Sequence, residues 1–166
     1  MKTAIIAFLI CLSMFAFGYE KELFRESPCR QAYLYHFLER ACVYGDEIGV
    51  RILLAEGADP NGSGYKKYPD CVGISYEFTS PLFQASSQGH LAIVIMLLTS
   101  KADPNILEGE GYTPLLIAVE HNRPEIVKIL LQYGARIRMK GLYRDPIEVA
   151  IEKKYDEILR ILLEKK

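Results

Sequence analysis

The sequence predicts an all-α solenoid built from about four helix-turn-helix units. Two independent markers recur along the 166-residue chain at the same intervals of 44, 33 and 32 residues. One marker is a pair of leucines, and the other is an alanine in the preceding helix: Leu53-Leu54, Leu97-Leu98, Leu130-Leu131 and Leu162-Leu163, with Ala41, Ala85, Ala118 and Ala150. Periods of about 20 to 50 residues are typical of repeat proteins, in which each unit packs on its neighbours.

Each unit is predicted to contain a short helix, a tight turn, a longer helix and an extended loop. Three of the first helices begin with a capping residue followed by proline: Ser80-Pro81, Thr113-Pro114 and Asp145-Pro146. Proline is favoured at the first helical position because its missing N–H has no intrahelical partner there. The two helices reverse direction at Gly45 and Gly89, which adopt a left-handed backbone without steric cost. Asn122 and Lys154 take this position in the later units, and lysine suits it least.

The composition describes one compact domain and excludes some classes of partner. Hydrophobic residues make up 50% of the chain and charged residues 25%, the balance of a globular protein. The formal net charge is −1 and no segment is strongly basic, so a nucleic acid is not expected as a partner. Four cysteines and three histidines leave little room for a metal centre, and no cofactor is expected.

The second and third units carry the motifs of a known repeat. Residues 111–118 are Gly-Tyr-Thr-Pro-Leu-Leu-Ile-Ala, residues 124–135 are Pro-Glu-Ile-Val-Lys-Ile-Leu-Leu-Gln-Tyr-Gly-Ala, and Ala-Asp-Pro-Asn occurs at 58–61 and 102–105. On these motifs the chain resembles the ankyrin-repeat family over residues 36–166. The resemblance implies units at about 36–61, 80–105, 113–138 and 145–166. It also implies binding of other proteins through a concave surface formed by loop tips and first helices.

Residues 1–18 are predicted to be a secretory signal peptide. Lys2 supplies a positive charge, residues 4–17 are apolar apart from Ser13, and Ala16 and Gly18 are small residues where a signal peptidase cleaves. As a helix the apolar run is about 21 Å long, shorter than the roughly 30 Å hydrocarbon core of a bilayer. We therefore expect an exported protein, periplasmic or secreted, with an N-terminal capping extension at residues 19–35. A membrane is a partner only in the alternative in which the N-terminal segment stays uncleaved.

An elongated loop separates the first two units. The first interval is 44 residues where the next is 33, which predicts an inserted loop at residues 62–77. Tyr65, Tyr68 and Tyr76 lie in it among glycines and serines, a combination that suits an adaptable contact surface. The other interpretation is a tolerated surface insertion, because loops lengthen at a small thermodynamic cost.

The cysteines predict one disulfide in the exported chain. On one helix over residues 28–44, Cys29 and Cys42 would be about 20 Å apart, farther than the roughly 7 Å between Cα atoms that a disulfide allows. Cys29 and Cys71 both fall on the loop side of the stack, so we predict that these two are bonded. Cys42 is expected to be a small buried thiol. The alternative is three free thiols, mainly if the chain is not exported.

No catalytic, metal or small-molecule site is predicted. His36, His90 and His121 each have a structural place in the repeat, and His36, Cys29 and Cys42 cannot all point at one zinc ion from a single helix. The sequence contains no phosphate-binding loop or nucleophile elbow, so we expect neither an enzyme nor a small-molecule substrate. Asn61-Gly62-Ser63 matches a glycosylation acceptor, but a structural role is favoured because Asn61 belongs to the loop motif.

The resemblance places a partner-binding surface on the loop tips and first helices. Its predicted residues are Tyr35, Tyr44, Tyr65, Tyr68, Tyr76, Glu77, Gln88, Glu110, Tyr112, Glu120, His121 and Arg144. Tyrosine and arginine are among the residues most often found as binding anchors. The alternative for Tyr35 and Tyr44 is that they only cover the end of the solenoid.

The predicted partner is another exported protein. An exported solenoid with no catalytic chemistry acts through what it covers, so the leading hypothesis is binding that neutralises or masks its partner, as an immunity protein or inhibitor does. The alternatives are a periplasmic scaffold or stress-protection factor for an envelope enzyme, and a secreted effector that binds host proteins. The fold alone does not distinguish these roles.

Overall fold

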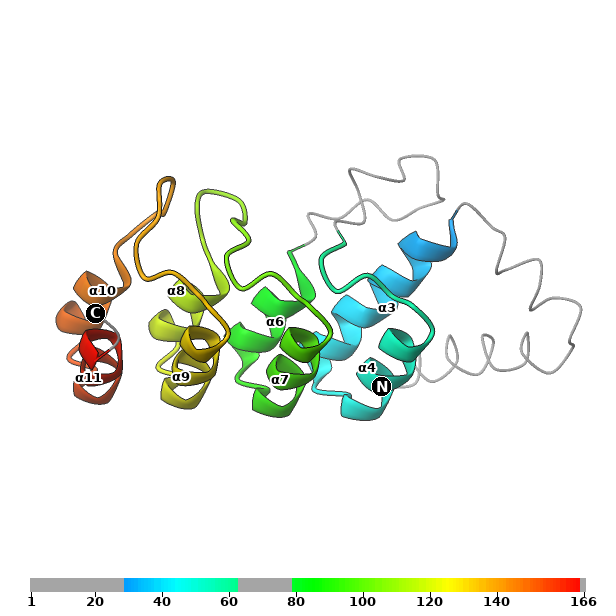
Figure 1. Ribbon diagram of the computed structural model, residues 1–166, viewed down its shortest axis with the longest axis horizontal. Helices are drawn as coiled ribbons and strands as arrows, with labels where there is room; N and C mark the ends of the chain where they lie inside the picture. Colours follow the sequence, from blue (N-terminus) through cyan, green and yellow to red (C-terminus); the bar gives the residue numbers. More distant parts are fainter. Residues whose placement is uncertain (1–28, 63–78, 165–166) are drawn as a thin grey trace, which may run out of the picture.

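The computed structural model describes residues 29–62 and 79–164 (Figure 1). The predicted signal peptide, residues 19–28 of the capping extension and residues 63–77 of the insertion lie outside the described residues. The described residues form eight helices: α3 (Arg30–Tyr44), α4 (Glu47–Ala55), α6 (Pro81–Gln88), α7 (Leu91–Thr99), α8 (Pro114–Glu120), α9 (Pro124–Gln132), α10 (Pro146–Glu152) and α11 (Asp156–Glu164).

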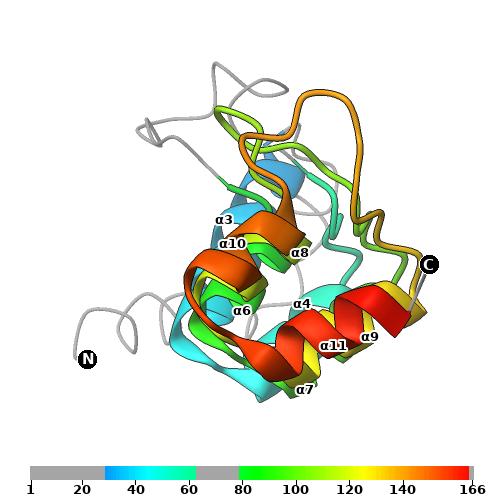
Figure 2. The ribbon, with the colours of Figure 1, turned by 90° about the vertical axis from the view of Figure 1, so that its left-hand side faces the viewer.

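The eight helices form four helix-turn-helix pairs that stack side by side. The first helices α3, α6, α8 and α10 lie in one row and the second helices α4, α7, α9 and α11 in another, with the loops on one side of the stack (Figures 1 and 2). Within each row every helix packs on the next, and the two helices of each unit also pack on one another. The predicted all-α repeat solenoid is confirmed.

The predicted caps fix the starts of three first helices. The hydrogen bonds run from Leu116 N–H to Thr113 Oγ1 (3.1 Å), from Phe83 N–H to Ser80 Oγ (3.3 Å) and from Ile147 N–H to Asp145 Oδ1 (2.8 Å). Each bond satisfies one of the N–H groups that a helix leaves without an intrahelical partner. The first helices are therefore anchored at their loop ends.

The reversals between helices are left-handed in all four units. The φ angles are 74° at Gly45, 91° at Gly89, 53° at Asn122 and 57° at Lys154, so lysine adopts the position that suits it least. At Gly45 the constraint is also steric, because a Cβ atom would lie 2.7 Å from Cε1 of His90. The imidazole of the second unit therefore packs on the turn of the first, and its Nε2 lies 3.3 Å from the carbonyl oxygen of Val43. These contacts give His90 the structural role predicted for it.

The hydrophobic core lies between consecutive units. Leu97 and Leu130 have 0% of their surface exposed. Leu131 and Leu163 occupy the same position in the third and fourth units, yet Leu131 is 2% exposed and Leu163 is 46% exposed. The burial of this position therefore depends on a following unit.

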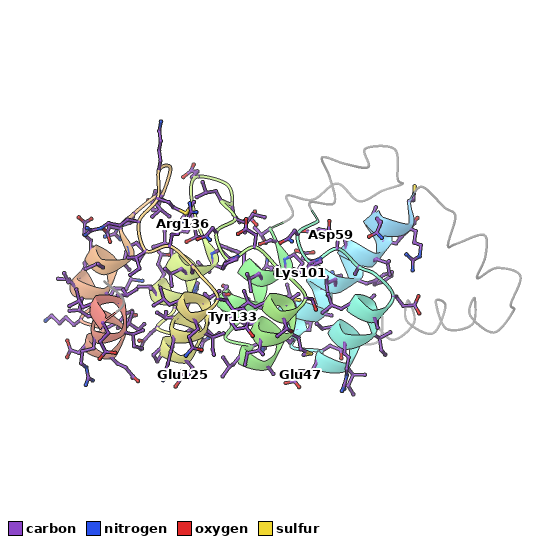
Figure 3. The ribbon with its side chains drawn as sticks, in the orientation of Figure 1. Glu47, Asp59, Lys101, Glu125, Tyr133 and Arg136 are labelled. Atoms are coloured by element: carbon purple, nitrogen blue, oxygen red, sulfur yellow. The ribbon has the colours of Figure 1, made fainter. Side chains whose placement is uncertain are left out.

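Two asparagines link the loops of consecutive units by the same pair of hydrogen bonds. Asn61 Nδ2 donates to the carbonyl oxygen of Lys101 at 2.9 Å, and Asn61 Oδ1 accepts from the N–H of Asp103 at 2.6 Å. Asn105 makes the equivalent bonds to Gly134 O (3.1 Å) and Arg136 N–H (2.8 Å); Lys101 and Arg136 are labelled in Figure 3. Both ends of the Asn61 amide are used within the fold, which confirms its structural role.

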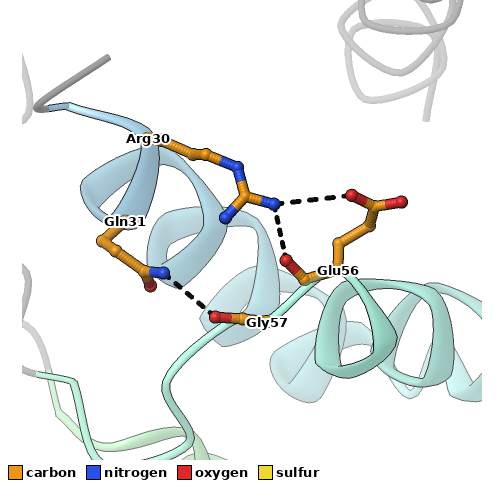
Figure 4. A network of polar contacts seen from close by, with 4 residues as sticks. All are labelled: Arg30, Gln31, Glu56 and Gly57. Carbon is orange, nitrogen blue, oxygen red and sulfur yellow. Dashed lines mark hydrogen bonds and ion pairs between the residues drawn. The ribbon is translucent and has the colours of Figure 1, made fainter. Parts of the chain in front are cut away.

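The start of α3 is bound to the end of α4 (Figure 4). Arg30 Nη2 donates to the carbonyl oxygen of Glu56 at 2.6 Å and lies 3.4 Å from its Oε2, while Gln31 Nε2 donates to the carbonyl oxygen of Gly57 at 3.0 Å. These bonds hold the two helices of the first unit together on the loop side. Because α3 begins at Arg30, the predicted boundary between capping extension and first unit, after residue 35, falls inside one helix.

The two described cysteines lie near opposite ends of α3. Cys42 is fully buried and its thiol is free, as predicted. Burial, and then the nearby Glu39 carboxylate, raises the pKa of the Cys42 thiol well above its ordinary value, so this thiol is protonated and unreactive at neutral pH. Cys29 is disulfide-bonded to a partner outside the described residues. The pairing of Cys29 with Cys71 stays a prediction.

The prediction that Tyr35 contacts a partner is wrong. Its side chain is 3% exposed, and its hydroxyl donates a hydrogen bond to the carbonyl oxygen of Thr79 at 2.9 Å. Its ring also packs on Gly62, where a Cβ atom would lie 2.9 Å from Tyr35 Cδ2. Gly62 and Thr79 flank residues 63–78. The buried tyrosine therefore holds the two ends of the inserted segment together, a structural role that leaves no surface for a partner.

Leu131→Ala is expected to lower the free energy of unfolding by about 2 to 5 kcal/mol, because it leaves a cavity between two units. Leu163→Ala removes the same atoms from a half-exposed site and is expected to cost about 1 kcal/mol or less. Urea unfolding followed by far-UV circular dichroism measures both values. Equal losses in the two variants would show that the following unit does not determine the burial of this position.

Tyr35 is expected to make stability fall at alkaline pH. Burial, with smaller contributions led by Glu39, raises the pKa of the Tyr35 hydroxyl far above its ordinary value of 10.0. The unfolded chain releases this proton near pH 10 and the folded chain keeps it. The contribution of Tyr35 is therefore fully present below pH 10 and is lost above it, by about 1.4 kcal/mol per pH unit.

The variant Tyr35→Phe isolates this effect, because Cys42 and the other tyrosines titrate equally in both proteins. At neutral pH it is expected to lose about 1 kcal/mol with its hydrogen bond to Thr79. Between about pH 10 and pH 11 the free energy of unfolding of the variant should decline by roughly 1 kcal/mol less than that of the wild type, because the unfolded tyrosine is already half ionised at pH 10. Parallel declines in urea-unfolding series would rule out a raised pKa at Tyr35.

Candidate functional site

The loops and the first helices form the surface on which a partner was predicted to bind. Viewed along the stack, the loops turn away from the first helices on one side of the molecule (Figure 2). Of the predicted contact residues on it, Tyr44 is 67% exposed, Gln88, Glu110 and His121 are exposed, and Tyr112, Glu120 and Arg144 are partly exposed. Tyr65, Tyr68, Tyr76 and Glu77 lie outside the described residues.

The predicted residues at the helix ends form a regular row. Tyr44, Gln88 and His121 occupy the same place in three consecutive units, at the ends of α3, α6 and α8. The guanidinium carbon of Arg40 lies 5.2 Å from the centre of the Tyr44 ring, and Arg40 Nη2 donates to its hydroxyl at 3.1 Å. This row is polar, and the guanidinium of Arg40 already lies over the ring of its only tyrosine.

The loops of the third and fourth units bring two tyrosines together. The rings of Tyr112 and Tyr143 are stacked with their centres 4.9 Å apart and their planes 22° apart. Tyr112 also packs against the hydrophobic core, whereas Tyr143 is 51% exposed. Leu107 adds a second exposed apolar side chain to these loops, at 43%. Neither Tyr143 nor Leu107 is among the contact residues predicted from the sequence. Both are large apolar residues at loop tips, and that was the signal that could have identified them.

The two loops are locked to one another through their backbones. Tyr143 N–H donates to the carbonyl oxygen of Gly111 at 2.9 Å. Gly111 has φ 101°, and a Cβ atom there would lie 2.1 Å from the carbonyl oxygen of Gly141, so no other residue fits. Glu108 and Tyr112 exchange two backbone hydrogen bonds of 2.8 and 3.0 Å within the first of these loops. The tyrosine pair therefore stands on an ordered frame.

The charges around the tyrosine pair are only partly balanced. Arg138 forms an ion pair with Asp145 at 2.7 Å, and Arg144 forms one with Glu152. Lys153 Nζ donates to the backbone carbonyl oxygen of Glu120 at 3.0 Å. The pKa of Arg144 is raised chiefly by Glu152, and the negative charge of Glu120 also contributes to the rise. Among the described residues, Glu110 and Glu120 form no ion pair.

The pKa of the Tyr112 hydroxyl is raised, in part by the carboxylates of Glu120 and Glu110. Partial burial raises it first, and the negative charge of Glu120, the neighbouring Tyr143 and the charge of Glu110 raise it further. Glu120 comes from the end of α8 and Glu110 from the loop before it. Side chains from two elements therefore place negative charge around one tyrosine. The surface offers aromatic faces, hydroxyls and carboxylates, which are groups for non-covalent recognition.

The remaining candidate residues have structural contacts. His121 Nδ1 lies 3.1 Å from the carbonyl oxygen of Ile117 in the same unit, and burial with the adjacent Arg40 lowers the pKa of His36. Within residues 29–62 and 79–164, no group of three or more His, Cys, Asp or Glu side chains could hold a metal ion. Over the same residues, every helix is too short or too polar to cross a bilayer.

Comparison with known proteins agrees with this geometry. A family model described as ankyrin repeats in three copies matches residues 82–166. The putative ankyrin repeat protein YahD of Escherichia coli (strain K12) is 35% identical over 89 residues, covering 49% of this chain and 44% of that protein. A putative ankyrin repeat protein of Rickettsia bellii is 28% identical over 123 residues, covering 64% and 52%. Alpha-latrocrustotoxin-Lt1a of Latrodectus tredecimguttatus is 34% identical over 116 residues, covering 68% and 7%.

The matched region thus spans from 7% to 52% of the length of these three relatives. The family model and the names of two of these relatives describe the same ankyrin repeat. The family model covers the last three of the four stacked units. On this agreement of motif, fold and relatives, the chain belongs to the ankyrin-repeat family.

Proposed function

We propose that this chain binds another exported protein through the loop-tip and first-helix surface, and that this binding neutralises or masks the partner. Ankyrin repeats form protein–protein interaction modules. The observation that supports binding at the loop tips is the ordered Tyr112–Tyr143 pair, because a half-exposed aromatic ring on a rigid loop frame is typical of a binding anchor.

Export is supported by the N-terminal sequence, and a disulfide at Cys29 is compatible with it. The apolar run at residues 4–17 follows a lysine and ends in small residues, as secretory signals do. A structural disulfide persists in oxidising compartments and is rare in the cytosol. A chain that is exported and acts by covering its partner fits an inhibitor or immunity protein, with no catalytic role for its histidines.

Co-purification of the tagged protein from the organism that produces it, with mass spectrometry, identifies the partner. Tyr143→Ala is expected to weaken binding by about 2 kcal/mol or more, roughly thirtyfold, because it removes the outer ring of the pair. The matched control is Tyr133→Ala, which removes a tyrosine that is 43% exposed and lies at the end of α9, away from the loop tips (Figure 3).

Circular dichroism of both variants checks that they are folded. If Tyr133→Ala abolished binding and Tyr143→Ala left it intact, the loop-tip surface could not be the binding site. The identity of the partner separates the roles: a secreted toxin supports neutralisation, whereas an envelope enzyme or a host protein supports a scaffold or an effector instead.

Peptide mapping of the protein from its native source, without reduction, tests the compartment. We expect Cys29 to be joined to Cys71, an interval of roughly 42 residues whose closure stabilises the fold by about 4 kcal/mol in the chain-entropy model. We also expect the N-terminus near Tyr19. A reduced Cys29 together with an intact Met1 in that sample would contradict export.

A further inference from the structure

We infer that the Tyr112–Tyr143 pair, together with Glu110 and Glu120, receives an arginine side chain of the partner protein. The inference rests on the proposed function, because it names the chemistry of the segment that this part of the surface binds. It is carried by three features of the described residues: the order of the two loops, the exposed aromatic ring and the local charge.

The site is ordered before a partner arrives. The hydrogen bond from Tyr143 N–H to Gly111 O and the close approach of Gly111 to Gly141 join the two loops at their backbones. Glu108 extends the frame, because its Oε1 accepts from the N–H of Ser80 at 2.7 Å in the neighbouring unit. Binding therefore immobilises little of this chain, so weak contacts contribute more of their energy to affinity.

The outer ring is placed to bind a cation. Tyr112 packs against the core and stacks with Tyr143, and the half-exposed ring of Tyr143 forms the outer layer. A cation over an aromatic face is attracted by the negative face of the ring. Arginine is favoured over lysine because its planar guanidinium also stacks on the ring and is more weakly hydrated.

The local charge favours a cation over an anion. Arg138 and Arg144 are already bound to Asp145 and Glu152, whereas Glu110 and Glu120 form no ion pair among the described residues. A guanidinium at the tyrosine pair would be drawn by both carboxylates, and an acidic side chain would be repelled. Lys140 in loop 137–145 and Lys153, whose Nζ donates to the carbonyl oxygen of Glu120, are exposed cations that oppose the binding of another positive charge.

An apolar residue should accompany the arginine. A Cβ atom on Gly141 would lie 3.5 Å from Cδ1 of Leu107, so the 43% exposed Leu107 belongs to the same pair of loops. Its side chain offers apolar contact area on these loops. The expected ligand is thus a protein segment in which arginine neighbours a leucine, isoleucine, valine or phenylalanine.

Selection of displayed random peptides tests this without knowledge of the partner. Peptides are selected for binding to the wild-type protein and counter-selected against Tyr143→Ala. We expect the peptides that survive both steps to carry arginine far more often than aspartate or glutamate, beside an apolar residue. Fluorescence anisotropy of one such peptide then gives dissociation constants for a set of variants.

Glu120→Gln is expected to raise the dissociation constant of this peptide by about twofold to fivefold, the range of an exposed cation–π or ion-pair contact. The matched control Glu125→Gln removes a carboxylate on the second helix α9 and should leave the affinity unchanged. Lys140→Gln should tighten binding by about twofold, since it removes a repelling charge. Tyr143→Phe should retain binding because the ring, and not its hydroxyl, makes the contact.

Selected peptides rich in acidic residues, or apolar peptides without arginine, would overturn the inference. It would also be overturned if the selected peptides containing arginine bound Glu120→Gln as tightly as the wild type. The proposed function is tested separately, because it fails if no protein co-purifies with the wild type, if Tyr143→Ala retains the partner, or if the native protein has a reduced Cys29 and an intact Met1.

Discussion

The structure depends on one constraint: a helix pair of this length cannot bury its apolar face alone. Each helix of the last three units has seven to nine residues, too few to be stable in water without packing. Leu131 and Leu163 show the constraint directly, since the same side chain at the same position is buried only where another unit follows. Stability is therefore shared between units through their interfaces, as in other solenoids.

Hydrogen bonds between consecutive loops extend this coupling of the units to the proposed binding surface. Asn61 and Asn105 tie each loop to the turn of the next unit through both ends of a side-chain amide. Arg138 stands at the next equivalent position and binds Asp145 instead, so the asparagine series ends at the third unit. The two loops that Asn105 joins are also held together by the close approach of Gly111 to Gly141. The tyrosine pair lies on this doubly connected pair of loops.

A single side chain, that of Tyr35, contacts the residues on both sides of the inserted segment. Tyr35 packs on Gly62 and binds Thr79, so one buried ring closes the base of the insertion while the helices of units one and two stack beside it. The stacking of α3 on α6 is therefore compatible with an insertion between their units. A residue predicted to bind a partner is instead the internal connection that makes the long loop possible.

Local chemistry in the sequence determined the repeat, its caps, its reversals and the buried thiol of Cys42. These features depend on residues within one unit, or on the fixed period between units, so spacing alone identifies them. Tyr35 and Tyr143 were assigned wrongly or missed because their roles depend on residues far along the chain: Thr79 for Tyr35, and Gly111 and Tyr112 for Tyr143. Only the stacking of the units brings those residues together. The sequence by itself determined which residues could form helices and turns, and the tertiary structure decided which tyrosine is buried and which is exposed, because burial is set by the neighbouring unit.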